Sequence, residues 1–402
     1  MGFKVLIIGC GAQGKVISTY MARAPDVDEI RLSDIDLEVC KRHADRLKSE
    51  KVSIHRVDAS KIDEVTSLAE GVDVVVNAVV PRFNLSIMDA ALKNGVHYVE
   101  LAFGPPYENF EKELERSEKF KDRGLTALTG AGSAPGITNV LAAHAAERLD
   151  SVDAIHIRIF DSVESKEIVS TWSPETMFGD MAAEPVVYQN GEYKKVPPFS
   201  GEEVYSFPDP IGRQSVFWHI HEEVLTLPRF IGKGLRYVDL KLGSPDIPTI
   251  KSLVKLGLCS NEPREVKGVK VAPQDIILRL LPPSLSPEEI EEKIKAGVLI
   301  DAHQCYVIEV EGERACEKLT YTFSVNFPTL REVQKMLPGA THESYVTGVS
   351  AAIFTKMLGE GKIKTKGLVS SECLGREFRE AFLAALAKEG IRIREKIERW
   401  LN

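Results

Sequence analysis

Three glycines near the start of the chain have the spacing of a nucleotide-binding loop. The stretch that forms this G-x-G-x-x-G is Gly9, Cys10, Gly11, Ala12, Gln13 and Gly14. In such a loop the first glycine allows a tight turn, the second the close approach of a pyrophosphate, and the third close packing of helix on strand. The N–H groups at the start of the following helix then bind the phosphates. We predict that Gly9, Gly11, Ala12, Gln13 and Gly14 contact a dinucleotide.

An acidic residue follows this loop at a suitable distance. Asp34 lies 20 residues after Gly14, at the end of the second predicted strand. A carboxylate there accepts from ribose hydroxyls and repels a 2′-phosphate, which favours NAD over NADP as the cofactor.

Two further pairs of residues are expected to line the nucleotide. Asp58 and Ala59 follow the third strand and would lie at the adenine end, although Asp58 could equally be a helix N-cap. Asn77 and Ala78 follow the fourth strand and would lie on the nicotinamide side.

Candidate proton-transfer groups occur in the segment HYVEL. His97 and Glu100 are expected at the carboxyl end of a predicted strand, where ligands of parallel sheets collect. His97 could instead be a buried histidine bonded to backbone. Glu100 is the stronger candidate. Burying a carboxylate costs free energy, so a buried carboxylate at a strand end indicates a functional role.

A second group of titratable residues is Trp218-His219-Ile220-His221-Glu222-Glu223. His219 and His221 would share a face if the segment were extended, and His219 and Glu222 if it were helical. His219 and Glu222 are predicted to be catalytic residues or substrate contacts. The pattern lacks a third ligand at a metal-motif spacing, so no metal is expected. Trp172 could close over the substrate, and Arg213 or Arg229 could bind a substrate carboxylate. For Thr341-His342-Glu343 the expectation is a helix cap.

The first 130 residues alternate short apolar runs with longer amphipathic stretches. Strands are predicted over 4–9, 29–33, 52–57, 72–78, 97–101 and 126–129, with helices between them. This alternation predicts an α/β fold, a Rossmann-type doubly wound parallel sheet, over residues 1–130.

The pattern changes after residue 150. Residues 154–159 and 319–323 alternate with period two, and Glu311-Gly312 after 307–310 predicts a hairpin turn. An α+β substrate domain with a mainly antiparallel sheet is therefore expected over 131–345. The remaining segment, 346–402, is predicted to be helical.

Composition narrows the class of protein. The 402 residues are 44% hydrophobic and 27% charged, with a net charge of −8, which suits a globular enzyme and disfavours a nucleic-acid surface. No window approaches the roughly 18 consecutive apolar residues that a membrane span needs. The six cysteines lie far apart without a CxxC pair, which predicts reduced thiols and a cytoplasmic protein.

Several segments together resemble one known family. They are GCGAQG at 9–14, VVVNAVVP at 74–81, HYVEL at 97–101, TGAGSAPGITNVLA at 129–142, TWSPETMF at 171–178 and THESYVTGVSAAIF from 341. Their order and spacing resemble the saccharopine dehydrogenase family. The resemblance implies C-terminal helices that pack back on a Rossmann domain, a homodimer, and oxidation of a carbon–nitrogen bond by a nicotinamide cofactor. Such chemistry needs a neutral amine, and therefore a base that works near pH 7.

The resemblance leaves the amino-acid substrate open. Saccharopine reductases and carboxynorspermidine dehydrogenases have an Asp before the Pro that corresponds to Pro135, whereas this chain has Ala134. Lysine 6-dehydrogenases share Ala-Pro-Gly, Trp-Ser-Pro and a preference for NAD. We expect hydride transfer from a lysine-like or saccharopine-like substrate, with Thr138 and Asn139 among its contacts. The alternatives are a carboxynorspermidine dehydrogenase-like enzyme and a protein that binds NAD without catalysis.

Overall fold

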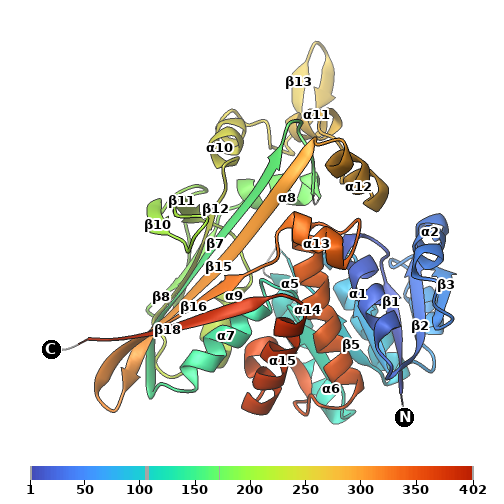
Figure 1. Cartoon of the computed structure of the whole chain (residues 1–402), viewed down its shortest axis with the longest axis horizontal. Coiled ribbons are helices and arrows are strands. Elements are labelled where there is room, and N and C mark those ends of the chain that lie inside the picture. The colour runs from blue at the N-terminus through green and yellow to red at the C-terminus, as the bar shows by residue number, and fades with distance from the viewer. Residues whose placement is uncertain (1, 105–107, 172, 401–402) are drawn as a thin grey trace. The chain divides into compact units, whose positions relative to one another are not determined.

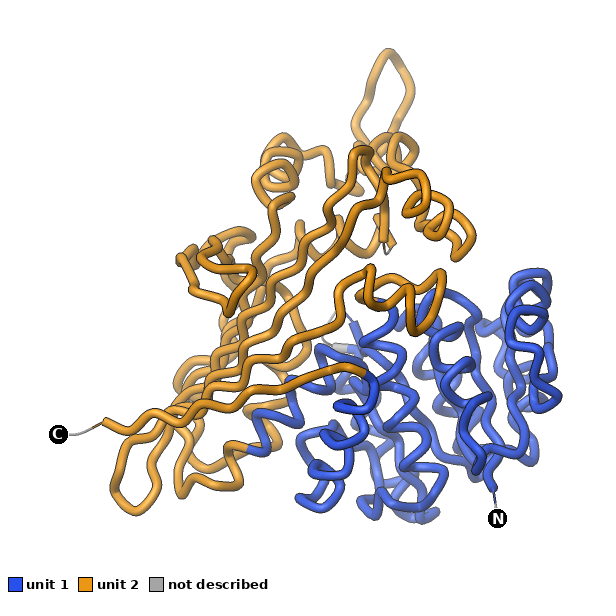
Figure 2. Tube along the Cα trace, in the orientation of Figure 1, with its two compact units in different colours: residues 1–144, 344–389 blue, residues 145–343, 390–402 orange. Residues whose placement is uncertain are grey.

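The computed structural model describes residues 2–104, 108–171 and 173–400. The chain divides into two compact units, residues 1–144 with 344–389 and residues 145–343 with 390–402 (Figure 2). The sequence patterns predict domain boundaries near residues 130 and 345. In the structure residues 131–144 belong to the first unit, and the C-terminal segment is shared between both units.

The first unit contains a seven-stranded parallel sheet in the order β17-β6-β5-β4-β1-β2-β3. Its strands are β1 (Phe3–Ile8), β2 (Val27–Asp34), β3 (Val52–Arg56), β4 (Val74–Asn77), β5 (His97–Glu100), β6 (Thr126–Thr129) and β17 (Gly367–Ser370). The strand order reverses between β1 and β4, and doubly wound sheets bind ligands at the carboxyl ends beside such a reversal. The predicted Rossmann-type fold is confirmed.

Helices complete this unit. They are α1 (Ala12–Arg23), α2 (Leu37–Leu47), α3 (Ile62–Leu68), α4 (Asn84–Asn94), α5 (Glu108–Leu114), α6 (Ser117–Asp122), α7 (Ile137–Ala146), α14 (His342–Gly359) and α15 (Arg376–Lys388), with short 3-10 turns η1 (Pro81–Phe83) and η2 (Ser371–Cys373). Local chemistry fixes several ends: Asp36 caps α2 by accepting from the N–H of Glu38, and Gly95 ends α4 in the left-handed conformation. Gly348 lets α14 lie against α1, since a Cβ there would be 2.5 Å from Cβ of Val16.

The second unit is built on a nine-stranded sheet whose main path is β10-β11-β12-β7-β15-β16-β18. Its strands are β7 (Ser151–Ser165), β8 (Val186–Gln189), β9 (Glu192–Lys195), β10 (Glu203–Ser206), β11 (Arg213–Trp218), β12 (Tyr237–Gly243), β15 (Leu299–Arg314), β16 (Glu317–Asn326) and β18 (Arg392–Arg399). β7 and β12 pair in parallel and the other pairs are antiparallel, as expected of a mainly antiparallel sheet. Figure 1 shows the long strands β7 and β15 side by side.

Shorter elements are attached to this sheet. They are α8 (Pro174–Ala182), α9 (Glu223–Ile231), α10 (Ile247–Lys255), α11 (Pro273–Leu280), α12 (Pro287–Lys295), α13 (Leu330–Met336) and a separate hairpin of β13 (Arg264–Val266) and β14 (Val269–Val271). In the described part of the chain, no helix is long and apolar enough to cross a bilayer.

The predicted hairpin forms, but its turn lies further along the chain. β15 continues through Gly312, and the turn is at Ala315 and Cys316, both with positive φ. Gly312 is needed inside the strand because a Cβ there would be 2.1 Å from the carbonyl oxygen of Ser151. The glycine therefore marks a close approach of two strands rather than a turn.

The C-terminal prediction of helices was wrong in two segments, the first of which is residues 367–370, which form strand β17 beside β6. Residues 392–399, expected to continue a helix, form strand β18 along β16. Charged residues occupy every position there except Ile393 and Ile397, and this composition suits a solvent-exposed edge strand as well as a helix. Pairing with β16 decides between the two.

Candidate active site

The glycine loop has the geometry that its spacing predicts. Gly9 follows β1 with φ +103°, and a Cβ there would be 2.6 Å from the carbonyl oxygen of Ala78. A Cβ on Gly14 would be 1.8 Å from the carbonyl oxygen of Gly9, whereas one on Gly11 would meet nothing within 4 Å. The chain itself thus requires Gly9 and Gly14, while the space beside Gly11 is free for a ligand.

The start of α1 and the end of β2 supply polar groups around this space. The first N–H groups of a helix, here at Ala12 and Gln13, have no acceptor within the helix. Oε1 of Gln13 is buried without a partner among the described residues. The carboxylate of Asp34 accepts from the N–H of Cys10 at 2.7 Å and from that of Asp36 at 3.0 Å. It still has lone pairs for sugar hydroxyls, so this loop fits a dinucleotide.

The side chain of Asn77 bonds to neighbouring residues. It is buried and donates to Oδ1 of Asn84 at 2.8 Å and to the hydroxyl of Tyr98 at 2.9 Å, while its oxygen accepts from the N–H of Val79. The side-chain amide of Asn77 is thus used within the fold, and the predicted position of Asn77 beside the nicotinamide stays a prediction. Ala78 lies beside the glycine loop.

Asp58 forms a local turn. Its Oδ1 accepts from both the N–H and the hydroxyl of Ser60, and Lys61, rather than Asp58, is the N-cap of α3. Ala59 is buried, and its carbonyl accepts from the hydroxyl of Ser86. The expected N-cap role of Asp58 was wrong by three positions, and the adenine contact stays a prediction.

His97 is at the opposite end of its strand from the expected one. It is the first residue of β5 and pairs with Val74, about 10 Å from the carboxyl end of the strand. Its Nδ1 accepts from the N–H of Thr126 at 3.0 Å, and burial lowers its pKa. The prediction of a catalytic His97 is therefore contradicted, and the histidine is a neutral structural group.

Glu100 is at the carboxyl end of β5, as predicted. Its Oε1 accepts from the hydroxyl of Thr129 and from the N–H of Gly130, the latter at 2.9 Å. The side chain is 1% exposed. These bonds hold the end of β6, and the proton-transfer role of Glu100 stays a prediction.

Thr138 and Asn139 have similar structural partners. Both are fully buried near the start of α7. Asn139 accepts from the N–H of Gly136 at 3.2 Å and donates to Glu372 at 3.0 Å. The amide thus fixes the turn before α7, which favours a structural role over the predicted substrate contact.

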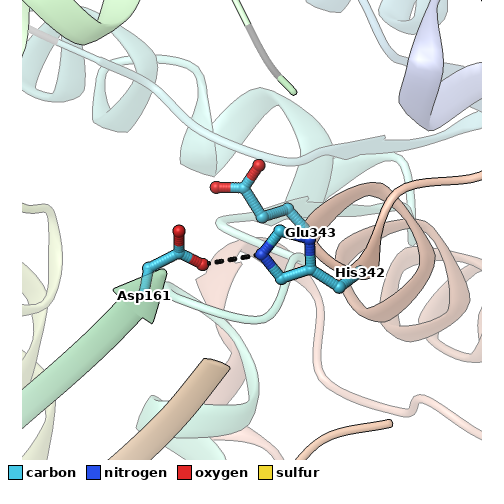
Figure 3. A group of neighbouring side chains, drawn as sticks. All are labelled: Asp161, His342 and Glu343. Atoms are coloured by element: carbon cyan, nitrogen blue, oxygen red, sulfur yellow. Dashed lines mark hydrogen bonds and ion pairs between the residues drawn. The ribbon is translucent and has the colours of Figure 1, made fainter. Parts of the chain in front are cut away.

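Three titratable side chains of the second unit converge where β7 ends and α14 begins. Asp161 extends from β7, and His342 and Glu343 are the first residues of α14 (Figure 3). Nε2 of His342 lies 2.9 Å from Oδ2 of Asp161, and Glu343 accepts from the hydroxyl of Thr171 at 3.0 Å. We call Asp161, His342 and Glu343 the proton-transfer cluster.

The environment of this cluster suits proton exchange near neutral pH. Burial, with the nearby charge of Asp161, raises the pKa of Glu343 well above that of an exposed glutamate. Burial alone would lower the pKa of His342, but the carboxylate of Asp161 outweighs it and raises the pKa. Nδ1 of His342 is buried without a partner among the described residues. A carboxyl group that titrates near the working pH is what a general base requires.

Sequence reasoning missed this cluster. His342 and Glu343 do start a helix, as expected, but their side chains bond to Asp161 and Thr171 instead of capping it. A usable signal was present: α14 is apolar over most of its length, so two adjacent titratable residues at its start lacked a packing role. No local sequence pattern pointed to Asp161, because its partner His342 lies 181 positions away in the sequence.

The remaining predicted residues are dispersed. His219 and Glu222 lie in the connection from β11 to α9, so the helical face that would have joined them does not exist. His221, between them, bonds to Glu223, and its Nδ1 lies 3.5 Å from Oε2 of Glu222. Arg213 is exposed at the start of β11, which favours a surface role. Trp172 lies outside the described residues.

Comparison with known proteins decides the family. Residues 5–128 match the family model described as saccharopine dehydrogenase NADP binding domain, and residues 132–391 match the saccharopine dehydrogenase C-terminal domain. The chain belongs to the saccharopine dehydrogenase family. As a member, it is an oxidoreductase with an NAD(P)-binding domain.

Individual members of the saccharopine dehydrogenase family cover most of the chain. It is 28% identical over 400 residues to carboxyaminopropylagmatine dehydrogenase of Synechocystis sp., spanning 96% of each chain. It is 26% identical to carboxynorspermidine synthase of Vibrio cholerae, over 70% of this chain and 74% of that protein. Apo saccharopine dehydrogenase of Saccharomyces cerevisiae has the same fold, with a TM-score of 0.72 at 16% identity over 99% of this chain and all of that one.

Within the described part of this family member, two groups have a composition that could hold a metal. They are the proton-transfer cluster and His221 with Glu222 and Glu223, and in each the ligand atoms lie within 4.8 Å of one another. In each group the histidine already has a carboxylate partner. Hydride transfer to a nicotinamide requires no metal, and the proton-transfer reading accounts for the first group.

Proposed function

We propose that the protein catalyses reversible oxidation of a secondary amine in which an amino-acid chain is joined to an aminoalkyl chain. The proton-transfer cluster is the observation that supports this proposal most directly. When bound, the nicotinamide cofactor supplies the hydride acceptor or donor. The protein residues supply orientation and handle protons.

The chemistry assigns a role to Glu343. Loss of hydride from carbon needs the nitrogen lone pair, so an ammonium must first give up its proton. Glu343 is placed to accept that proton, and the pair of Asp161 and His342 stabilises the resulting charges. Hydrolysis of the C=N bond then adds water to carbon and releases a primary amine and an aldehyde, with the same groups moving protons.

The substrate class rests on the relatives. Two of them, named for a carboxylated agmatine derivative and for carboxynorspermidine, act on polyamine derivatives. This favours the carboxynorspermidine dehydrogenase-like alternative over a lysine-like or saccharopine-like substrate. We retain NAD as the preferred cofactor, because the carboxylate of Asp34 lies beside the glycine loop.

A substrate panel tests the proposal. Purified protein is assayed for oxidation of NADH and NADPH with 1,3-diaminopropane, 1,4-diaminobutane or agmatine, each with an α-amino-acid semialdehyde. The reverse assays use saccharopine and lysine with NAD and NADP. We expect turnover with a diamine pair and NADH, and a kcat at least about 100-fold lower in Glu343→Gln.

The control is Glu164→Gln, which removes an exposed carboxylate near Asp161 on the same strand. It should leave kcat unchanged. Faster oxidation of lysine or saccharopine than of the diamine products would contradict the substrate class. Equal activity with NADPH would contradict the cofactor preference, and tight NAD binding without any turnover would favour the non-catalytic alternative.

We further propose that the enzyme is a cytoplasmic homodimer. Cys10, Cys40, Cys259, Cys305, Cys316 and Cys373 are all free thiols, which suits a reducing compartment. The dimer rests on the family resemblance.

A further inference from the structure

A small cavity in the second unit is lined by aromatic rings and two titratable groups. Its walls include Phe199, Phe217, Trp218, Asp180 and His219. The cavity is open on one side, and the empty space within it and at its mouth, open solvent included, is about 250 Å³. Neither Asp180 nor His219 belongs to the proton-transfer cluster.

The carboxylate of Asp180 has no hydrogen-bonded or ion-paired partner among the described residues. It extends from α8 and is half-buried. Burial and the charge of Glu222 raise its pKa to about 7, although His221 opposes this. A cation bound in the cavity would favour the ionised form of the Asp180 carboxyl group.

His219 does not supply that cation. Burial, with the neighbouring His221, lowers the pKa of His219 to about 3, so its ring is neutral. Lys251, outside the lining residues, holds its ammonium 4.6 Å from the ring centroid of Phe217. That ring thus already attracts one cation, and aromatic faces beside a carboxylate are the surroundings that organic cations prefer.

The cavity lies on the same face of the sheet as Asp161. Leu242, one of its lining residues, pairs with Ile159 in parallel strands β12 and β7. Ile159 and Asp161 are two positions apart and therefore share a face. From strand geometry, the Cα atoms of Leu242 and Asp161 are roughly 8 Å apart. A short aliphatic chain can connect the two places.

We propose that this cavity binds the distal cationic group of the substrate, an ammonium or guanidinium, while the reacting nitrogen lies at the proton-transfer cluster. Asp180 is the specificity-determining residue. The inference rests on the proposed function, since it names the end of the substrate that does not react.

Direct binding separates this inference from catalysis. The full-length protein without cofactor is titrated calorimetrically with 1,4-diaminobutane, and its unfolding midpoint is measured. Asp180→Asn should weaken binding at least about tenfold without lowering the midpoint. Asp180→Glu, which keeps the charge, should stay within about threefold of the unmodified protein. Glu184→Gln, the control at an exposed carboxylate outside the cavity, should bind normally.

Three results would overturn the subsite. They are no binding of the diamine to the unmodified protein, unchanged binding in Asp180→Asn, and equal losses in Asp180→Asn and Asp180→Glu. Because no hydride transfer is measured, diamine binding that depends on the Asp180 charge would support the cavity even if the substrate panel failed. Turnover without such dependence would support the enzyme and reject the cavity.

Discussion

At the residue scale, the glycines of the loop differ in whether the fold or a bound ligand would require them. Gly14 has no room for a methyl group because the carbonyl of Gly9 is in contact, whereas Gly11 has open space around it. The fold therefore requires Gly14, and we predict that the bound cofactor requires Gly11.

This difference gives a matched pair of variants. Gly14→Ala should destabilise the protein, because the 1.8 Å approach to a backbone oxygen forces the loop to shift. Gly11→Ala should keep the unfolding midpoint yet weaken NAD binding at least about tenfold, because its methyl group enters the space predicted for the pyrophosphate. Thermal unfolding and fluorescence titration with NADH measure the two effects. Equal affinity for NADH in Gly11→Ala and the unmodified protein would argue against this placement of the cofactor.

His221 makes the free energy of unfolding depend on pH. Burial alone would lower its pKa, but Glu223 and Glu222 outweigh it and raise the pKa to about 9 from 6.5. Below pH 6.5 the folded and unfolded chains both hold the proton, so the stabilisation is fully present. As the pH rises toward 9, the unfolded chain loses the proton first and the stabilisation declines.

We expect the free energy of unfolding to fall by roughly 2–3 kcal/mol between pH 6 and 10 through this group alone. Urea unfolding at several pH values measures it. His221→Asn should give a flatter profile over that range than the unmodified protein. Parallel profiles for the two proteins would show that His221 does not hold its proton as inferred.

At the scale of elements, β18 shows how local pattern and pairing can disagree. Its sequence has charges on most positions, and a helix and an edge strand both accept them. Backbone pairing from Leu319 to Asn326 with Arg399 to Arg392 settles the conformation. The same applies to the hairpin, where a glycine that suggested a turn lies inside a strand.

Deleting residues 391–402 should destabilise the second unit, because it leaves the β16 edge without its partner strand and exposes Phe323. Differential scanning calorimetry should show a lower midpoint, and the truncated protein should aggregate more readily. The double change Lys396→Gln and Glu398→Gln, which alters only exposed charges on β18, is the control and should unfold normally. An unchanged midpoint after truncation would mean that β18 adds no stability.

At the scale of the whole molecule, each compact unit is completed by a segment far away in sequence. β17 extends the nucleotide-binding sheet beyond β6, and β18 extends the second sheet beyond β16. The chain therefore passes between the units at residues 144, 343 and 389. Such long-range completion is invisible to patterns that extend over a few residues.

The sequence by itself determined the nucleotide half of this protein. The loop from Gly9 to Gly14, Asp34 and the alternation of strands and helices are encoded within short windows, because they depend on turn geometry and on local periodicity. Only the tertiary structure decided the proton-handling half. Asp161 meets His342 across 181 positions, His97 lies at the amino end of its strand, Asn139 bonds to Glu372, and Asp180 faces a cavity. Side chains from distant segments acquire shared chemistry only when packing places them in contact, and no local pattern encodes that contact.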